Sequence, residues 1–288
     1  MTIPGSSMTA ARVMLLTTLA LLAFAANSLF CRAALRDTAI DAATFTTVRL
    51  VSGALTLWLI VVLRRGGPGL AGDWRSAAAL FAYAIAFSLA YRSLTAAAGA
   101  LLLFGAVQMT MTGYGLWRGE RMRGLQWLGL ATALAGLAGL LLPGLSAPPL
   151  SGALLMIFAG MAWGVYSLRG RGSGDPISAT AGNFLRAVPL ALACSLLLLD
   201  TARWDVNGAI HAVASGVMAS GIGYAIWYAA LPGLKASTAA TLQLSVPVIA
   251  TFGAIAFLGE QLTLRLVLAS VTILGGIALV ITGSSRKN

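Results

Sequence analysis

Long apolar runs separated by short polar breaks make up almost the whole chain. Two of these runs, within residues 236–281, are separated only by Gly259, Glu260 and Gln261. A helix needs about 20 residues to cross the hydrocarbon core of a bilayer, and each run is long enough to do so. This stretch therefore predicts a tight hairpin of two membrane-spanning helices.

The same pattern recurs along the chain and predicts ten spans in all. A backbone in lipid has no water to bond, so an apolar segment must satisfy its own hydrogen bonds as a helix. We therefore expect an all-α membrane protein with ten transmembrane helices. The predicted spans are residues 13–30, 42–63, 74–91, 96–117, 125–142, 150–168, 177–199, 209–230, 236–258 and 263–282.

The second half of the chain repeats the first. Gly259 and Glu260 have counterparts 140 positions earlier in Gly119 and Glu120. Such a Gly-Glu step is harder to match by chance than an alanine or a leucine, so the pattern indicates an internal duplication. In the front part of each half the spacing is 137, and the pairs there include Arg49 with Arg186, Phe87 with Tyr224 and Tyr91 with Tyr228.

An odd number of spans in each half places the two halves upside down relative to each other. This inverted repeat is typical of secondary transporters, whose binding site lies near the midplane where the repeats meet. We expect one membrane domain, with residues 1–142 as the first five-helix repeat and residues 143–288 as the second. The run Ala23-Phe24-Ala25 also fits a signal-peptide cleavage site, but cleavage would remove one span and break the duplication, so we expect the first helix to be retained.

Composition and charge agree with a membrane protein and argue against a nucleic-acid partner. Hydrophobic residues make up 59% and charged residues 9% of the chain, whereas soluble proteins have roughly 25% charged residues. The net charge is +11, but the basic residues are dispersed between apolar runs and form no stripe for nucleic acid. With the N-terminus inside, twelve Lys and Arg lie in the cytoplasm and five outside, which predicts cytoplasmic N- and C-termini.

Three short segments and two arginines carry a resemblance to a known family. The segments are FLGEQLT at 257–263, its echo WRGERMR at 117–123, and GYAIWYAAL at 223–231; Arg49 and Arg186 lie early in the second and seventh spans. The chain resembles the EamA-type ten-helix members of the drug/metabolite transporter superfamily, and among them bacterial aromatic amino acid exporters. The resemblance implies a multi-pass protein of the bacterial inner membrane that exports small amphipathic metabolites by alternating access.

Aromatic side chains are the first candidates for substrate binding. Tyr83 and Phe87 lie four residues apart and share one face of the third span, and Tyr224 and Trp227 lie in the eighth. Phe87 and Tyr224 are repeat partners, so both halves can present an aromatic wall to a central cavity. Ordinary helix packing is the alternative, and for Tyr91 and Tyr228, at the span ends, the interfacial aromatic belt explains the position well.

Uncharged polar groups complete the predicted substrate site. Asn27, Gln108 and Gln243 lie well inside apolar runs, where an amide without a partner is costly. Hydrogen bonding between helices is the alternative interpretation. Trp163 lies midway along the sixth span, at a position that is aromatic in the resembling family, and can offer its ring face to an ammonium group or simply fill volume.

Three residues are candidate hinges for alternating access. Gly113 in the fourth span and Pro247 and Gly253 in the ninth can soften their helices. The position 140 residues before Pro247 is occupied by Val107 and not by a second proline. The fourth and ninth spans are therefore not expected to bend in the same way.

The ionisable residues bear on energy coupling. Only Arg49 and Arg186 lie well inside predicted spans, away from the first few residues, and we expect them at opposite depths, in a structural or snorkelling role more than as substrate ligands. All eight acidic residues lie in loops or at helix ends, and Glu260 is expected in an external turn. Proton antiport usually needs a titratable group on the path, so we expect facilitated export rather than proton coupling.

Other functions fit the sequence less well. Export of another metabolite or of a drug-like compound stays open. A membrane enzyme is less favoured, because one histidine and acids confined to loops offer no metal site, no cofactor is implied, and no nucleophile and base stand together. Since both halves of a pathway lie in one chain, a monomer in the lipid bilayer suffices.

Overall fold

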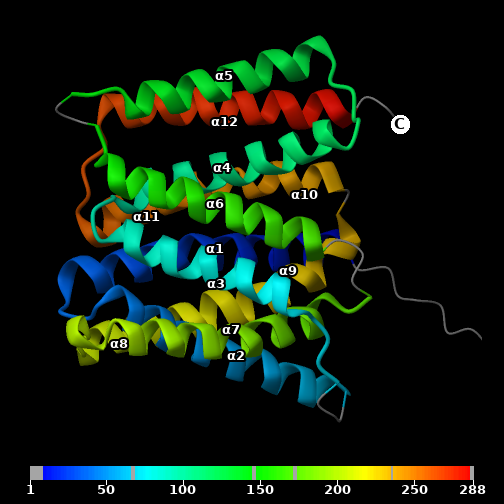
Figure 1. Cartoon of the computed structure of the whole chain (residues 1–288). Coiled ribbons are helices and arrows are strands. Elements are labelled where there is room, and N and C mark those ends of the chain that lie inside the picture. The colour runs from blue at the N-terminus through cyan, green and yellow to red at the C-terminus, as the bar shows by residue number, and fades with distance from the viewer. Residues whose placement is uncertain (1–8, 66–68, 145–146, 171–173, 235, 286–288) are drawn as a thin grey trace, which may run out of the picture.

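The chain folds into a bundle of helices that run roughly parallel or antiparallel to one another (Figure 1). The computed structural model describes residues 9–65, 69–144, 147–170, 174–234 and 236–285. In the first half the helices are α1 (Ala10–Asp37), α2 (Ala42–Arg65), α3 (Trp74–Tyr91), α4 (Ala96–Trp117) and α5 (Gly124–Leu141).

The second half has more elements because two of its predicted spans are interrupted. The elements are α6 (Leu150–Gly170), α7 (Pro176–Leu197), α8 (Val206–Ala214), the π-helix η2 (Ser215–Ile222), α9 (Gly223–Ala230), α10 (Ala236–Gln243), α11 (Ser245–Leu258) and α12 (Leu264–Ser285), with short 3₁₀ turns η1 (Leu199–Thr201) and η3 (Leu231–Gly233).

The bundle has two ends. Helix α1 begins and α12 ends at the same end, which we call the terminal end (Figure 1). At the other, the distal end, α1 joins α2, α3 joins α4, and α11 joins α12. Which end faces the cytoplasm stays a prediction from the distribution of basic residues.

Nine membrane-spanning candidates, by length and apolarity, lie within the described residues. The helices α8, η2 and α9 together make one of them, and the ninth predicted span forms another. The predicted span that is not among these candidates is helix α3, because Trp74, Arg75 and its tyrosines make it less apolar than the others. Ten of the 18 residues of α3 are buried by neighbouring helices, so it does not need an apolar surface all round. An all-helical membrane fold is therefore confirmed, but not the count of ten spans.

Acidic side chains stabilise the starts of several helices. Asp73 accepts a hydrogen bond from the backbone N–H of Ser76 at 3.0 Å, and Asp205 accepts one from Gly208 at 2.8 Å. Such capping satisfies backbone donors that the helix leaves unpaired, and a negative charge suits the N-terminal dipole. This is why acidic residues are found at helix ends in a chain with so few of them.

The glycines of the repeated Gly-Glu steps end helices in the same way. Gly259 and its counterpart Gly119 have left-handed φ angles of 62° and 88°. A residue with a side chain is strained there, and glycine is the common solution at the end of a helix. Each Gly-Glu step therefore marks a sharp turn, as the hairpin pattern predicts.

Two predicted spans depart from a continuous α-helix. The eighth contains the π-helix η2, which the sequence analysis did not predict. The ninth is broken at Leu244, between α10 and α11, three residues before Pro247. Proline lacks an N–H and its ring clashes with the carbonyl four residues earlier, which here belongs to Gln243, so the break follows from Pro247.

Helices of one half pack against helices of the other half in a symmetric pattern. Helix α5 packs on α12 and α2 on α7, so these pairs join equivalent helices of the two repeats. Helix α6 packs on α3 and α4. Its predicted repeat partner α1 packs on the corresponding elements of the second half, which are α8, η2 and α9 in place of α3, and α11 in place of α4. This is the pattern expected if a two-fold axis relates the predicted repeats.

Helices α5 and α12 touch through their backbones. A Cβ added to Gly276 would lie 2.5 Å from the carbonyl oxygen of Gly129 and 2.6 Å from the backbone nitrogen of Ala133, closer than atoms can pack. A Cβ added to the neighbouring Gly275, which is exposed, would meet nothing within 4 Å. Small residues at such crossings are what allow helices in lipid to associate closely.

This contrast predicts opposite effects for two adjacent substitutions. Gly276→Ala should destabilise the protein by about 1–3 kcal/mol because the helices must separate, whereas Gly275→Ala should be neutral or stabilising, since alanine favours a helix by about 0.5–1 kcal/mol over glycine. Unfolding of the purified protein in detergent, followed by circular dichroism, measures both. Equal effects would contradict close backbone packing of α5 on α12.

Candidate functional site

Aromatic rings from three helices meet in the middle of the bundle. We call Tyr83 and Phe87 of α3, Trp163 of α6 and Tyr224 of α9 the aromatic cluster. The ring centre of Trp163 lies 4.6 Å from that of Tyr83 and 5.5 Å from that of Tyr224, and Tyr83 lies 5.3 Å from Phe87. Rings at these separations pack edge to face or offset, and together they form an apolar wall with polar rims.

Two further predicted residues adjoin the aromatic cluster. Asn27 of α1 donates from Nδ2 to the Tyr83 hydroxyl at 3.2 Å. Trp227 reaches the cluster through Phe24, whose ring centre lies 5.9 Å from Trp227 and 5.5 Å from Tyr224. Six of the eight predicted substrate-binding residues therefore lie in one connected region.

The remaining two predicted residues do not take part in the hydrogen bonds and ring contacts that join this region of the described chain. Gln108 lines a separate hollow near the terminal end. Gln243 is the last residue of α10, is half-buried, and lines neither of the hollows described below. An amide inside an apolar run looks the same in the sequence whichever neighbour it faces, so the sequence could not separate these two from Asn27.

Tyr91 does not belong to an interfacial belt, and that interpretation is wrong. Its side chain is fully buried, with its ring 4.7 Å from Phe87 and its hydroxyl donating to the Ala96 carbonyl at 3.3 Å. The ring lies over Gly99, where a Cβ would come within 2.3 Å of it. The turn between α3 and α4 folds this tyrosine inward, and a missing side chain at Gly99 makes room for it.

Arg49 of α2 is a buried ionisable residue that adjoins the aromatic cluster. It is 2% exposed and its guanidinium lies over two rings of the aromatic cluster, 5.3 Å from the centre of Tyr83 and 5.1 Å from that of Phe87. Its Nη2 donates to the Tyr83 hydroxyl at 3.1 Å and its Nε to Ser220 at 3.5 Å. A cation beside aromatic faces gains electrostatic stabilisation, more so when water is excluded.

One nitrogen of Arg49 is left without a partner. Nη1 is buried and makes no hydrogen bond, and no carboxylate of the described residues forms an ion pair with this side chain. A buried donor left unpaired costs about 1–3 kcal/mol, and more for a charged group. The sequence showed the charge but not the missing counter-ion, because counter-ions come from distant segments.

The π-helix η2 positions the serines of this region. Ser215 donates to Asn27 Oδ1 at 2.6 Å, and Ser220 accepts from Arg49. In an α-helix, residues five positions apart point roughly 140° away from each other, at about 100° per residue, whereas both serines here are buried toward α1 and α2. Gly216 allows the close approach, because a Cβ there would lie 2.4 Å from the Arg49 carbonyl oxygen.

Arg186, the repeat partner of Arg49, lies in a different environment. It is half-buried, and its Nη1 donates to the carbonyl oxygens of Ala71 and Gly182, each at 3.0 Å. Ala71 lies in the connection between α2 and α3, so this side chain reaches toward the terminal end of the bundle. Backbone carbonyls satisfy this guanidinium in the way that a snorkelling arginine is satisfied.

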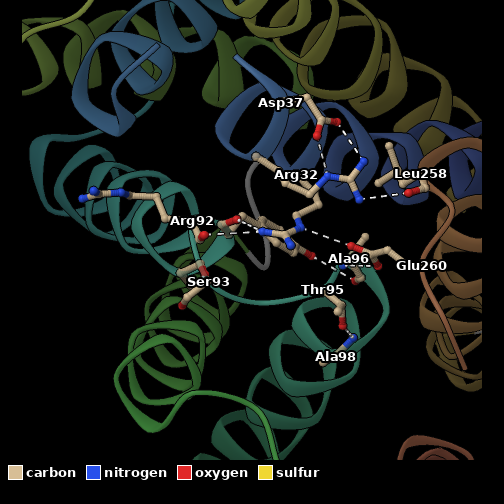
Figure 2. A network of polar contacts seen from close by, with 12 residues as sticks. Arg32, Asp37, Arg92, Ser93, Thr95, Ala96, Ala98, Leu258 and Glu260 are labelled. Carbon is tan, nitrogen blue, oxygen red and sulfur yellow. Dashed lines mark hydrogen bonds and ion pairs between the residues drawn. The ribbon is translucent and has the colours of Figure 1, made fainter. Parts of the chain in front are cut away.

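Polar contacts join three parts of the structure at the distal end, and we call them the distal latch (Figure 2). Arg32 of α1 donates from Nε to Glu260 Oε1 at 3.1 Å, and Glu260 Oε2 accepts from the Ala96 N–H, at the start of α4, at 2.8 Å. Arg32 also donates to the Tyr91 carbonyl at 2.9 Å, and Arg36 donates to the Leu258 carbonyl at 2.9 Å.

The ion pair of the distal latch, Arg32 with Glu260, is largely shielded from solvent. The side chains of Arg32 and Glu260 are 12% and 6% exposed. Glu260 does lie in the turn between α11 and α12, as expected, but its carboxylate points inward and ties that turn to α1 and α4. The latch therefore links α1, the start of α4 and the turn between α11 and α12 at the distal end.

The terminal end is hollowed in two places. One cavity of about 630 Å³ lies between α1, α2, α7 and α9, where Arg64, Asp175 and Tyr228 are among its lining residues. A second, of about 510 Å³, lies between α4, α5, α6, α10 and α12 and is lined in part by Gln108 and Glu120. Both volumes suit a small metabolite.

The predicted hinges occupy contrasting places. Pro247 is buried next to the break between α10 and α11, while Gly113 is exposed within the continuous helix α4. At Gly253 a Cβ would lie 2.5 Å from the side chain of Leu29, so this glycine lets α11 approach α1. Whether any of them bends during transport stays a prediction. Within the described residues no group of three or more His, Cys, Asp or Glu side chains could hold a metal ion.

Several known proteins are similar to this chain in sequence. Residues 150–282 match the model of the EamA-like transporter family. The uncharacterized protein PA1977 of Pseudomonas aeruginosa is 57% identical over 94% of both chains. The uncharacterized transporter YoaV of Bacillus subtilis is 25% identical over 58% of this chain and 61% of its own.

A solved crystal structure of a protein has the same fold. It superposes with a TM-score of 0.67, covering 97% of this chain and 100% of that one, at 20% sequence identity, which speaks for the fold alone. The resemblance seen in the sequence is thus confirmed at the level of the superfamily. The second half of this chain thus carries an EamA-like transporter domain, and the chain is a membrane transporter of the drug/metabolite transporter superfamily.

Proposed function

We propose that this protein exports amino acids with aromatic or apolar side chains across the bacterial inner membrane. The observation that supports the proposal is the aromatic cluster, with the polar groups of Asn27 and Arg49 beside it in the middle of the bundle. Aromatic rings suit an apolar side chain, and a few convergent polar groups suit the charged end of a small zwitterion. Because both repeats are present, one chain in the bilayer suffices.

Counterflow in proteoliposomes tests this function. Vesicles containing the wild-type protein and preloaded with unlabelled phenylalanine should accumulate labelled phenylalanine, and aromatic or apolar amino acids should compete. Trp163→Ala should raise the half-saturating phenylalanine concentration about tenfold, because the ring supplies much of the apolar contact. Phe252→Ala is the control, since that ring is 68% exposed on the surface of α11.

The competition panel also separates the alternatives. If amino acids neither exchange nor compete while another metabolite or a drug-like compound does, the substrate class proposed here is wrong and the wider transporter assignment stands. Equal losses in Trp163→Ala and Phe252→Ala would contradict a binding role for the aromatic cluster.

Alternating access is supported by the relation between the distal latch and its repeat partners. Arg169 lies 137 positions after Arg32, Glu120 lies 140 before Glu260, and Ala236, the first residue of α10, lies 140 after Ala96. The terminal end thus carries the same arginine, carboxylate and helix start as the latch. An inverted repeat exchanges the states of its two ends by such matched contacts.

The matched groups at the terminal end occupy other contacts in this structure. Arg169 donates to Asp73 at 2.8 Å and to Ser76 at 3.0 Å, both on the α3 side, and Glu120 is exposed. We propose that Arg169 leaves Asp73 and pairs with Glu120 at the start of α10 when the terminal end closes, while Arg32 and Glu260 separate. This structure then represents the state that is closed at the distal end.

Labelling of Cys31 tests this exchange. Cys31 is fully buried beside Arg32, and the other cysteine, Cys194, can be replaced by serine. In that background Glu260→Gln should speed labelling by a membrane-impermeant thiol reagent added to whole cells, by about tenfold, because losing one partner of a shielded ion pair favours opening. The reagent reaches the distal side if that side faces outward.

The matched variant should act in the opposite direction. Glu120→Gln removes a contact of the other state and should slow labelling of Cys31. Changes of the same sign in both variants, or no change in either, would contradict alternating latches.

Facilitated export is the proposed mode of energy coupling. Several acidic side chains of the described residues serve as helix caps or pair with arginines near helix ends, as Asp73 and Glu260 do. Hydrogen bonds from Ser76 and Arg169 lower the pKa of Asp73 to about 2. Its folded-state pKa lies below the usual value, so the pairing is retained above about pH 4 and is lost only as the pH falls toward 2.

Transport should therefore depend little on an imposed proton gradient. With equal phenylalanine concentrations on both sides, a pH difference between about 6 and 8 should drive no net flux, because Asp73 stays ionised throughout that range. In the same proteoliposomes, labelled phenylalanine measures the substrate flux and an internal pH-sensitive dye measures the proton flux. Substrate accumulation against its gradient, together with proton movement, would show coupling instead.

A further inference from the structure

Arg49 is a buried cation placed beside the aromatic cluster, and the described residues supply it with no carboxylate. We infer that Arg49 binds the carboxylate of the transported substrate. This inference rests on the proposed export of amino acids and names the group in the protein that selects them.

The donors of Arg49 are only partly used. Nη2 and Nε donate to Tyr83 and Ser220, while Nη1 is buried without a hydrogen bond. A guanidinium presents its N–H groups in a planar fork that matches the two oxygens of a carboxylate. A carboxylate at Nη1 would supply both the missing hydrogen bond and the missing counter-ion.

Tyr83 adds a second donor at the same place. Its hydroxyl oxygen accepts from Arg49 Nη2 at 3.1 Å and from Asn27 Nδ2 at 3.2 Å. A phenol has one proton and can accept two hydrogen bonds, so the Tyr83 proton remains available to donate to a ligand. Arg49 and Tyr83 together therefore form an anion site made of a charge and a neutral donor.

Ring contacts connect this site with the first cavity at the terminal end. Tyr228 lines that cavity, and its ring lies 6.1 Å from Tyr224, which packs on Trp163, which packs on Tyr83. The anion site is thus separated from the cavity by aromatic side chains and from the distal end by the latch. Rings along this route suit a substrate with an apolar side chain.

In the second repeat, the corresponding Arg186 is half-buried, and its Nη1 already donates to the carbonyl oxygens of Ala71 and Gly182. The protein should therefore recognise one carboxylate per substrate, and compounds that lack it should bind weakly even when their apolar part is the same.

Two pairs of compounds test the need for a carboxylate. L-phenylalanine is compared with L-phenylalaninamide, and phenylacetate with phenylacetamide, by isothermal titration of the purified protein in detergent. In each pair the carboxylate should bind about ten- to a hundredfold more tightly than the amide, as expected for a charge-assisted hydrogen bond in a shielded site. Equal affinities within both pairs, or no binding of either carboxylate, would overturn the inference.

Variants then assign the preference to Arg49. Arg49→Gln should bring the affinity for both carboxylates down to that of the amides, and Arg49→Lys should restore part of it, since the charge returns without the fork. Arg186→Gln is the matched control and should keep the preference. If Arg49→Gln retains the preference, or Arg186→Gln loses it, Arg49 is not the carboxylate ligand.

Counterflow of labelled phenylalanine separates this inference from the proposed function. Carboxylate binding that depends on Arg49, without counterflow, would support the anion site and contradict amino acid export. Counterflow that amides inhibit as well as acids would leave export standing and overturn the role of Arg49. If Arg49→Gln does not fold, the comparison of acids with amides in the wild-type protein still decides the question.

Discussion

The free-energy cost of burying charge in an apolar layer determines where the charged side chains of this protein lie and what they pair with. Asp73 and Asp205 cap helices near the ends of the bundle, and Arg32 and Glu260 shield each other in the distal latch. Arg186 reaches back to backbone carbonyls at the terminal end. Arg49 alone, among the arginines described above, keeps an unsatisfied nitrogen in the middle of the bundle. Because the other charges named above are paired or hydrogen-bonded, the unpaired nitrogen of Arg49 is the reason to propose a functional role for this residue.

The surroundings of Arg49 depend on a departure from regular helix geometry. The π-helix η2 brings both Ser215 and Ser220 toward α1 and α2, and Gly216 lets its backbone approach that of Arg49. Wide turns of this kind are rare and are frequently found at functional sites. The break before Pro247 interrupts the ninth predicted span in a similar way.

The two ends of the bundle hold matched groups in different contacts. The arginine and carboxylate of the distal latch are paired, whereas their repeat partners Arg169 and Glu120 are apart, with Arg169 on Asp73. In the proposed inverted repeat, one geometry of the latch serves at either end without new residues. The aromatic cluster and Arg49 lie between the two ends, where a transporter binding site is expected.

The sequence by itself determined the helical class, the positions of the nine membrane-spanning candidates of the described residues, the superfamily and most of the aromatic cluster. These features are local, because hydropathy and backbone hydrogen bonding act within one segment, and residues four apart share a helix face. Only the tertiary structure decided that Tyr91 is buried, that Asn27 bonds to Tyr83 while Gln108 lines a separate hollow, and that Arg49 lacks a counter-ion among the described residues. Whether a polar group finds a partner depends on segments far apart in the chain, as with Arg32 and Glu260, which are 228 residues apart.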